Sequence, residues 1–242
     1  MKINKVYRRS LFKQNCTLCD QTLPAIPQLP FVDLCEVCQQ ALPRNLNACR
    51  RCALPLKAQS ELELCGQCLS GQSSADRAWS PFLYELPFPA LISDWKYRAN
   101  RGQGRILSRL FLQALALEAW PMPELLIPVP LHPTRLRERG FNQSQWLARR
   151  ISKATGIPVA TQLIERSRVT LPQQGQSAKA RRANLRHAFR LTRTPDVAHI
   201  AIIDDVMTTG ATAESLIRIL RRAGVQQIDL WTLARTPLPS EH

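Results

Sequence analysis

Apolar residues after position 77 recur in two patterns that alternate along the chain. One is a helical spacing, clearest between Ile106 and Leu117, where apolar residues three and four positions apart form one buried face. The other is a short apolar run of strand length, such as residues 198–203 with three isoleucines. The predicted helices cover residues 87–97, 103–120, 143–155 and 211–223, and the predicted strands cover residues 78–85, 125–129, 198–203 and 227–233. This alternation favours a Rossmann-like α/β fold whose largely parallel sheet is covered on both faces and binds ligands at the carboxyl ends of its strands.

The length and composition of the chain predict two domains. Its 242 residues exceed the usual domain size of about 100 to 150 residues, and 45% of them are hydrophobic, which is typical of a folded protein. Residues 70–76 (SGQSSAD) are small and polar, as in a linker. We therefore expect a small module over residues 1–74 and an α/β domain over residues 75–242. Pro81 places the strand predicted over residues 78–85 at an edge of the sheet.

The N-terminus and the most apolar segment of the chain indicate where in the cell the protein resides. The N-terminus has basic residues but no apolar run that could serve as the core of a signal peptide. Residues 106–120 are interrupted by Ser108, Arg109, Gln113 and Glu118, which is typical of an amphipathic helix and not of a membrane span. The sequence therefore predicts a cytoplasmic protein that is not itself transmembrane.

All eight cysteines lie in the first 68 residues and form four Cys-x-x-Cys pairs. The pairs are Cys16/Cys19, Cys35/Cys38, Cys49/Cys52 and Cys65/Cys68. A two-residue gap lets both thiolates of a pair face one ion, and two pairs separated by 12 to 20 residues complete a tetrahedral zinc site. The separations here are 15 residues between Cys19 and Cys35 and 12 between Cys52 and Cys65, so consecutive pairing predicts two zinc ribbons. Cross-braced pairing of the first and third motifs stays open.

Three other uses of the cysteines compete with zinc. A disulfide scaffold requires an oxidising compartment, and the sequence offers no export signal. A thioredoxin-type redox site would be a single motif at a strand-to-helix turn, not four copies in a proline-rich segment. An iron–sulfur cluster also takes four thiolates, and spacing excludes it only weakly. Because a small ribbon buries little apolar surface, a bound metal would supply much of its folding free energy, so we expect two structural Zn²⁺ ions.

Basic residues are concentrated in the second half of the chain. The formal net charge is +15, and residues 135–193 contain 14 lysines and arginines against Glu138 and Glu165. Such a cluster attracts polyanions, whether pyrophosphate or the backbone of a nucleic acid. A solvated basic face is the alternative.

The turn after the strand predicted over residues 198–203 carries the clearest binding motif. Adjacent carboxylates, Asp204 and Asp205, can accept hydrogen bonds from the vicinal hydroxyls of a ribose. A small, hydroxyl-rich turn then opens a helix, where backbone N–H groups, threonine hydroxyls and the helix N-terminus favour a phosphate. The motif therefore predicts a site for ribose 5-phosphate. Its residues are Asp204, Asp205, Thr208, Thr209, Gly210, Ala211 and Thr212.

Two rival interpretations account for this motif less well. A plain turn with an aspartate N-cap would not require two acids and three threonines together. A Walker B strand would require a Walker A loop, and no G-x-x-x-x-G-K-[ST] occurs in the chain. The order of apolar strand, two acids and Thr/Gly-rich turn instead resembles the binding signature of type I phosphoribosyltransferases. That resemblance implies phosphoribosyl pyrophosphate with Mg²⁺ as the ligand, with its pyrophosphate near the basic residues Arg135, Arg139 and Lys179.

Three further segments extend the resemblance to one family. The chain is similar to the ComF family in the order of its segments. Behind an N-terminal module of Cys-x-x-Cys pairs come VPLHPTRLRERGFNQ, then TLPQQGQSAKARRANLRHAF, then IIDDVMTTGAT. Residues 139–143 match its RGFNQ block, residues 166–189 have the character of a mobile basic lid, and Trp95-Lys96-Tyr97 matches its apolar-Lys-aromatic block. Lys96 then either reaches an anion or is a solvated helix lysine.

The resemblance implies a type I phosphoribosyltransferase fold behind a zinc-ribbon module and a role in competence and DNA utilisation, beside DNA-uptake proteins at the inner face of the membrane. The leading hypothesis is a protein that binds phosphoribosyl pyrophosphate; if it is an enzyme, the reaction would displace pyrophosphate at ribose C1, and no catalytic residue is assigned. The alternative is a non-catalytic protein that binds single-stranded DNA, with phosphoribosyl pyrophosphate as its effector. A third hypothesis is an assembly adaptor that docks through its ribbons.

Overall fold

The computed structural model describes residues 15–23, 33–57, 63–71, 73–166 and 188–238, which form two compact units, residues 1–42 and 43–242. The division falls earlier in the chain than the boundary that we predicted between residues 74 and 75. The reason is that the segment after residue 42 joins the sheet. The N–H of Ala78 donates to the carbonyl of Arg50 at 2.7 Å, and Ala53 is buried in the core that the sheet shares.

The first unit is small. Its described part contains an antiparallel bridge between Asn15 and Thr22 and the short helix α1 (Glu36–Gln40). The helix begins after Cys35, whose Sγ accepts a hydrogen bond from the N–H of Cys38 at 3.4 Å. A cysteine therefore caps this helix in the way that a serine or aspartate usually does.

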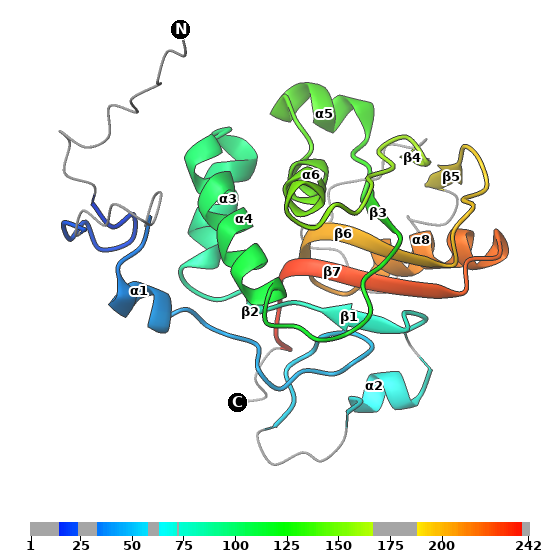
Figure 1. Ribbon diagram of the computed structural model, residues 1–242, viewed down its shortest axis with the longest axis horizontal. Helices are drawn as coiled ribbons and strands as arrows, with labels where there is room; N and C mark the ends of the chain where they lie inside the picture. The colour runs from blue at the N-terminus through cyan, green and yellow to red at the C-terminus, as the bar shows by residue number, and fades with distance from the viewer. Residues whose placement is uncertain (1–14, 24–32, 58–62, 72, 167–187, 239–242) are drawn as a thin grey trace, which may run out of the picture. The chain divides into compact units, whose positions relative to one another are not determined.

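The second unit is built on a parallel sheet (Figure 1). Its strands are β1 (Arg77–Trp79), β2 (Phe82–Leu83), β3 (Leu125–Pro128), β6 (His199–Met207) and β7 (Gln227–Arg235). The order is β1-β7-β6-β3, with β2 also paired to β7, and every pairing is parallel. This confirms the predicted sheet. The strand expected over residues 78–85 is split around Pro81, because proline has no N–H for the ladder, and β1 lies at an edge as predicted.

Helices cover both faces of the sheet, as the alternating pattern predicted (Figure 1). On one face lie α3 (Phe88–Tyr97), α4 (Arg101–Leu115) and α6 (Gln143–Thr155), and on the other lies α8 (Ala211–Arg222). Ile202 and Leu230 share a core with Leu216 of α8. Because strand side chains alternate, Ile203 and Trp231, both fully buried, face the opposite layer of helices. Burial on both faces explains the nearly continuous apolar run in β6.

Several elements differ from the prediction. A helix, α5 (Pro133–Arg139), occupies a segment for which no helix was predicted, and a two-stranded antiparallel ribbon, β4 (Ile164–Arg166) with β5 (Phe189–Leu191), was not predicted either. The same holds for the short helix α2 (Gly66–Leu69). Helix α4 ends at Leu115, earlier than expected, and β6 continues to Met207. Among the helices of the described residues, none has the length and apolar character needed to cross a membrane.

Candidate functional site

A pocket of about 360 Å³ lies at the carboxyl end of the sheet and gathers the residues that the sequence pointed to. The predicted residues on its wall are Arg135, Arg139, Asp204, Asp205, Thr208, Thr209, Gly210, Ala211 and Thr212. Lys179 and most of the basic segment over residues 166–189 lie outside the described residues. Tyr84, Ser144 and Thr232, for which the sequence predicted no ligand role, also line the pocket. So do Lys96, whose role the sequence left open, and Arg166, the first residue of the basic segment. The location follows the rule that parallel sheets bind ligands at this end.

The acid pair, Asp204 and Asp205, lies near the end of strand β6 and is held by side chains from two helices. The Oδ1 atom of Asp204 accepts hydrogen bonds from the Ser144 hydroxyl at 2.8 Å and from the N–H of Asp205 at 2.9 Å. The Oδ2 atom of Asp205 lies 2.8 Å from Nζ of Lys96 on α3. Lys96 is therefore mostly buried in an ion pair and is not a solvated helix lysine. Nothing in the sequence pattern pointed to Ser144.

The carboxyl group of Asp204 has an unusually high pKa. Burial and the neighbouring charge of Asp205 raise the pKa of Asp204 to about 7, against the opposing effects of Lys96 and Ser144. Burial alone would lower the pKa of Lys96, but its attraction to Asp205 raises that pKa above the ordinary value. Near neutral pH Asp204 can therefore gain or lose a proton when a cation or a hydroxyl group binds.

The turn after the acid pair forms the N-terminus of α8. Gly210 is the N-cap residue with φ +74°, a left-handed conformation that favours glycine, and no side chain of the described residues caps this end. Thr208 and Thr209 are exposed beside it. The free N–H groups of a 12-residue helix, together with these hydroxyls, offer donors to an anion. The turn thus has the chemistry of a phosphate cradle.

Arginines form the opposite wall. Arg139, at the end of α5, donates to Oε1 of Gln143 at 3.3 Å and to the Tyr97 hydroxyl at 3.4 Å, and its guanidinium lies 5.0 Å from the Tyr97 ring centroid. Arg166 of β4 joins Arg135 here, and burial followed by repulsion from Arg135 lowers the pKa of Arg166. The only sequence signal for Arg166 was its place at the start of the basic segment. Such crowding of positive charge suits a polyanion.

The RGFNQ block mainly shapes the turn between α5 and α6. Gly140 ends α5 with φ +74°, and Asn142 caps α6 by accepting from the N–H of Gln145 at 3.2 Å. The Asn142 amide also donates to the carbonyl of Val129, just after β3, at 2.9 Å. Phe141 packs between tryptophans of α3 and α6, with ring centroids 6.3 Å away in each case. The block therefore fixes α5, and with it Arg135 and Arg139, against the end of the sheet.

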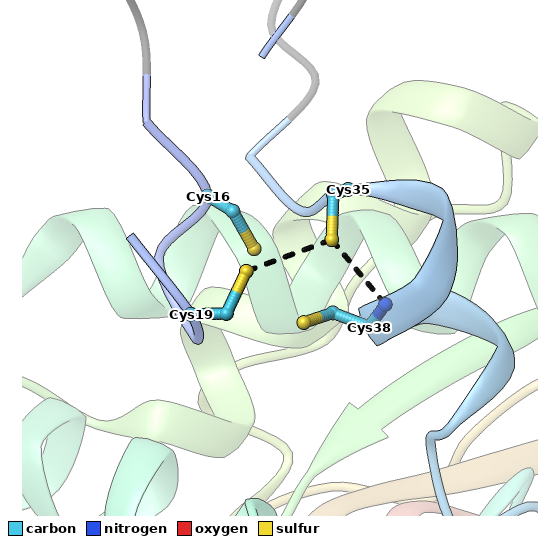
Figure 2. A group of neighbouring side chains, drawn as sticks. All are labelled: Cys16, Cys19, Cys35 and Cys38. Carbon is cyan, nitrogen blue, oxygen red and sulfur yellow. Dashed lines mark hydrogen bonds between the residues drawn. The ribbon is translucent and has the colours of Figure 1, made fainter. Parts of the chain in front are cut away.

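The cysteines gather into two clusters by consecutive pairing. The first cluster is Cys16, Cys19, Cys35 and Cys38, and the second cluster is Cys49, Cys52, Cys65 and Cys68. Figure 2 shows the thiols of the first cluster turned toward one another. Within each cluster all sulfur atoms lie within 4.8 Å of one another, and all eight cysteines are free of disulfides. This arrangement excludes cross-braced pairing.

The geometry of both clusters fits a tetrahedral metal ion. Four sulfurs at the usual zinc distance stand about 3.8 Å apart. The Sγ atoms of Cys19 and Cys35 are 3.7 Å apart, and those of Cys52 and Cys65 are 3.5 Å apart. Burial raises the pKa of Cys49, but hydrogen bonds from backbone N–H groups, the first from Cys65 at 3.3 Å, outweigh burial and lower it to about 7. Burial and the charges of neighbouring thiols raise the pKa values of Cys52, to about 12, and of Cys68, so only a bound cation would hold all four groups as thiolates.

Comparison with known proteins agrees with this geometry. Residues 111–240 match the phosphoribosyl transferase domain model, so the chain carries a domain of that class. The chain is 33% identical over 225 residues to "DNA utilization protein YhgH" of Salmonella typhi, covering 91% of this chain and 96% of the relative. It is 34% identical over 209 residues to "Competence protein F" of Haemophilus influenzae, covering 84% and 90%. It is 26% identical over 238 residues to "Competence protein ComFC" of Streptococcus pneumoniae, covering 91% and 99%. The chain therefore belongs to the ComF family.

Proposed function

We propose that this protein binds phosphoribosyl pyrophosphate with Mg²⁺ in the pocket at the carboxyl end of the sheet. The observation that carries the proposal is the convergence of three groups on one pocket: the acid pair, the uncapped N-terminus of α8 and the arginines of α5. A ribose diol requires hydrogen-bond acceptors, a 5-phosphate requires N–H donors, and a pyrophosphate requires cations. A single ligand that contains all three groups therefore matches the pocket.

The proposal gives each part of the wall a task. Asp204 and Asp205 accept hydrogen bonds from the ribose hydroxyls, and residues 208–212 hold the 5-phosphate. Arg135 and Arg139, with Lys179 from outside the described residues, bind the pyrophosphate. Lys96 holds the Asp205 carboxylate in place through the 2.8 Å ion pair. When bound, Mg²⁺ neutralises part of the charge on the pyrophosphate. Displacement of pyrophosphate at ribose C1 is the reaction that such binding would serve.

The wider role follows from the names of the relatives and from charge. We propose that the protein acts in DNA uptake or utilisation, in the cytoplasm, and that each cysteine cluster holds one structural Zn²⁺. Single-stranded DNA is a second proposed partner, because residues 135–193 carry 14 basic and two acidic residues. Proteins of the uptake machinery at the inner face of the membrane are the third.

The binding proposal is tested by calorimetric titration of phosphoribosyl pyrophosphate with Mg²⁺. The double variant Asp204→Asn, Asp205→Asn is expected to bind on the order of 100-fold more weakly than wild type, because two hydrogen bonds to charged acceptors are lost. Asp94→Asn is the matched control, since Asp94 is an acid of α3 that pairs with Arg98 at 3.6 Å outside the pocket wall. Equal binding by the double variant, or none by wild type, contradicts the proposal.

The raised pKa of Asp204 predicts a pH dependence of this binding. The ionised carboxylate is the better acceptor, so affinity should fall by up to about tenfold for each pH unit below 7, where Asp204 gains a proton. Titrations between pH 5.5 and 8.5 check this, with Asp204→Asn separating the step from titration of the ligand's own phosphates. The same shift makes folding stability decrease as pH rises from about 4 to 7, because only the unfolded chain releases this proton readily. A binding profile identical in Asp204→Asn would assign the step to the ligand.

A further inference from the structure

One buried guanidinium joins the second cysteine cluster to the turn that forms the phosphate cradle. Arg235, the last residue of β7, is only 6% exposed. Its Nε donates to the backbone carbonyl of Cys52 at 2.9 Å. Its Nη1 donates to the carbonyls of Met207 at 3.1 Å and Thr208 at 2.5 Å, where β6 passes into the turn. A metal ligand's backbone and the start of the cradle are therefore held by the same side chain.

A second connection runs from Arg51, the residue before Cys52, to helix α8. The Ser73 hydroxyl donates to the carbonyl of Arg51 at 2.8 Å. The next residue, Ser74, donates from its N–H and its hydroxyl to the two carboxylate oxygens of Glu214, at 2.7 and 2.8 Å. Glu214 lies in the first turn of α8. The loop between Cys49 and Cys52 is thus linked to both sides of the cradle, the end of β6 and the beginning of α8.

The shape of this loop depends on what the thiols bind. The backbone between two cysteines of a Cys-x-x-Cys pair is fixed when both thiolates hold one ion, and without the ion the pair loses that restraint. The Cys52 carbonyl would then no longer be held toward Arg235. A buried guanidinium that loses an acceptor moves to regain one, since an unpaired buried charge is strongly unfavourable. Its other acceptors are the carbonyls of Met207 and Thr208, at the start of the cradle, and of Thr236, the next residue in the chain.

We propose that Arg235 is a positioning residue through which the metal in the second cluster sets the affinity of the cradle for the 5-phosphate. The inference rests on the proposed binding of phosphoribosyl pyrophosphate and adds a regulatory coupling to it. Coupling between two binding sites is reciprocal, so the sugar phosphate must also tighten the hold of the second cluster on its metal. The first cluster belongs to the other compact unit and supplies an internal comparison.

The experiment measures zinc release from the full-length protein to a chromogenic chelator, with and without saturating Mg²⁺-phosphoribosyl pyrophosphate. Cys16→Ser, Cys19→Ser removes the first metal site, so the signal comes from the second cluster alone. The ligand is expected to tighten zinc binding about tenfold, and because affinity changes appear mostly in the dissociation rate, zinc release should slow by about the same factor. Arg235→Lys, which keeps the charge but loses the fork of donors, should retain zinc and lose the slowing. A purely structural role for Arg235 would not make zinc release depend on the ligand.

The outcomes separate the two proposals. Unchanged zinc release in a protein that binds the ligand by calorimetry overturns the coupling and leaves the proposed function intact. Absence of binding overturns both. Full slowing in a folded Arg235→Lys or Arg235→Gln variant overturns the role of Arg235. If neither variant folds, wild type decides: zinc removal from the second cluster should weaken ligand binding about tenfold, and added zinc should restore it, whereas unchanged affinity overturns the proposal.

Discussion

Replacing Cys49 by serine is expected to lower the melting temperature of the phosphoribosyltransferase unit by about 10 °C or more. Cys49 is fully buried in the second cluster, and the loss of one ligand removes much of the free energy that a structural metal contributes, on the order of 10 kcal/mol in isolated zinc peptides. A loss of only about 3 kcal/mol shifts the melting temperature of a domain of this size by roughly 10 °C. Scanning calorimetry with measurement of bound zinc checks the result.

The matched control is Cys16→Ser in the first cluster. Cys16 is also a buried cysteine of a four-cysteine cluster, but it belongs to the unit of residues 1–42. Its replacement should remove one zinc ion and leave the main transition of residues 43–242 within about 2 °C of wild type. Equal shifts for both variants would show that the two clusters stabilise the fold in the same way, against the structural division.

The contrast between the clusters could not be read from the sequence, where they look alike. Both consist of two Cys-x-x-Cys pairs with similar gaps, and a glycine- and serine-rich segment after Cys68 suggested a single linker. That segment is instead tied in place, because Ser74 binds Glu214 and Ser73 binds Arg51. Linker composition predicts turns, but a hydrogen bond from Ser74 to Glu214, 140 positions away, is not a local property.

The sheet and the acid pair were predicted because their signals are local. Strands β6 and β7 are buried on both faces, so each shows an apolar run, and the two acids and the threonines follow that run in β6 directly. Helix α5 was missed although its local signals were present: a proline at the first position and Gly140 after the last. The seven residues of α5 contain one large apolar side chain, Leu136, so no apolar periodicity accompanied these capping signals.

The partners of the acid pair depend on tertiary contacts. Lys96 and Ser144 reach Asp205 and Asp204 from helices that are 109 and 60 positions away in the sequence. The resemblance to the ComF family pointed to Lys96, but it left open whether this lysine binds an anion or is solvated. No sequence signal pointed to Ser144. The raised pKa of Asp204 follows from this packing and has no sequence signal. Sequence patterns thus predicted the acids, threonines and arginines of the pocket. The structure was needed to show that Lys96 and Ser144 contact the acid pair and influence its charge.

Gly104→Val is expected to destabilise the protein by about 3 kcal/mol, because a side chain at this position would clash with Trp95 of α3, the helix that carries Lys96. A Cβ atom at this position of α4 would lie 2.5 Å from Nε1 of Trp95, which is 1% exposed and precedes Lys96 on α3. Helix propensity alone would favour a side chain over glycine by less than about 1 kcal/mol, so the clash decides the sign.

Thermal melts and calorimetric titration of the Gly104→Val variant check both consequences of this contact. We expect a fall in melting temperature of roughly 10 °C and weaker binding of phosphoribosyl pyrophosphate, because a displaced Trp95 shifts Lys96 from Asp205. Gly66→Val is the control, since nothing lies within 4 Å of a Cβ there. Trp95→Phe removes the Nε1 atom that the new side chain would meet, so the double variant with Gly104→Val should lose less stability than the sum of the single variants. Strict additivity would show that Gly104 and Trp95 do not act through their contact.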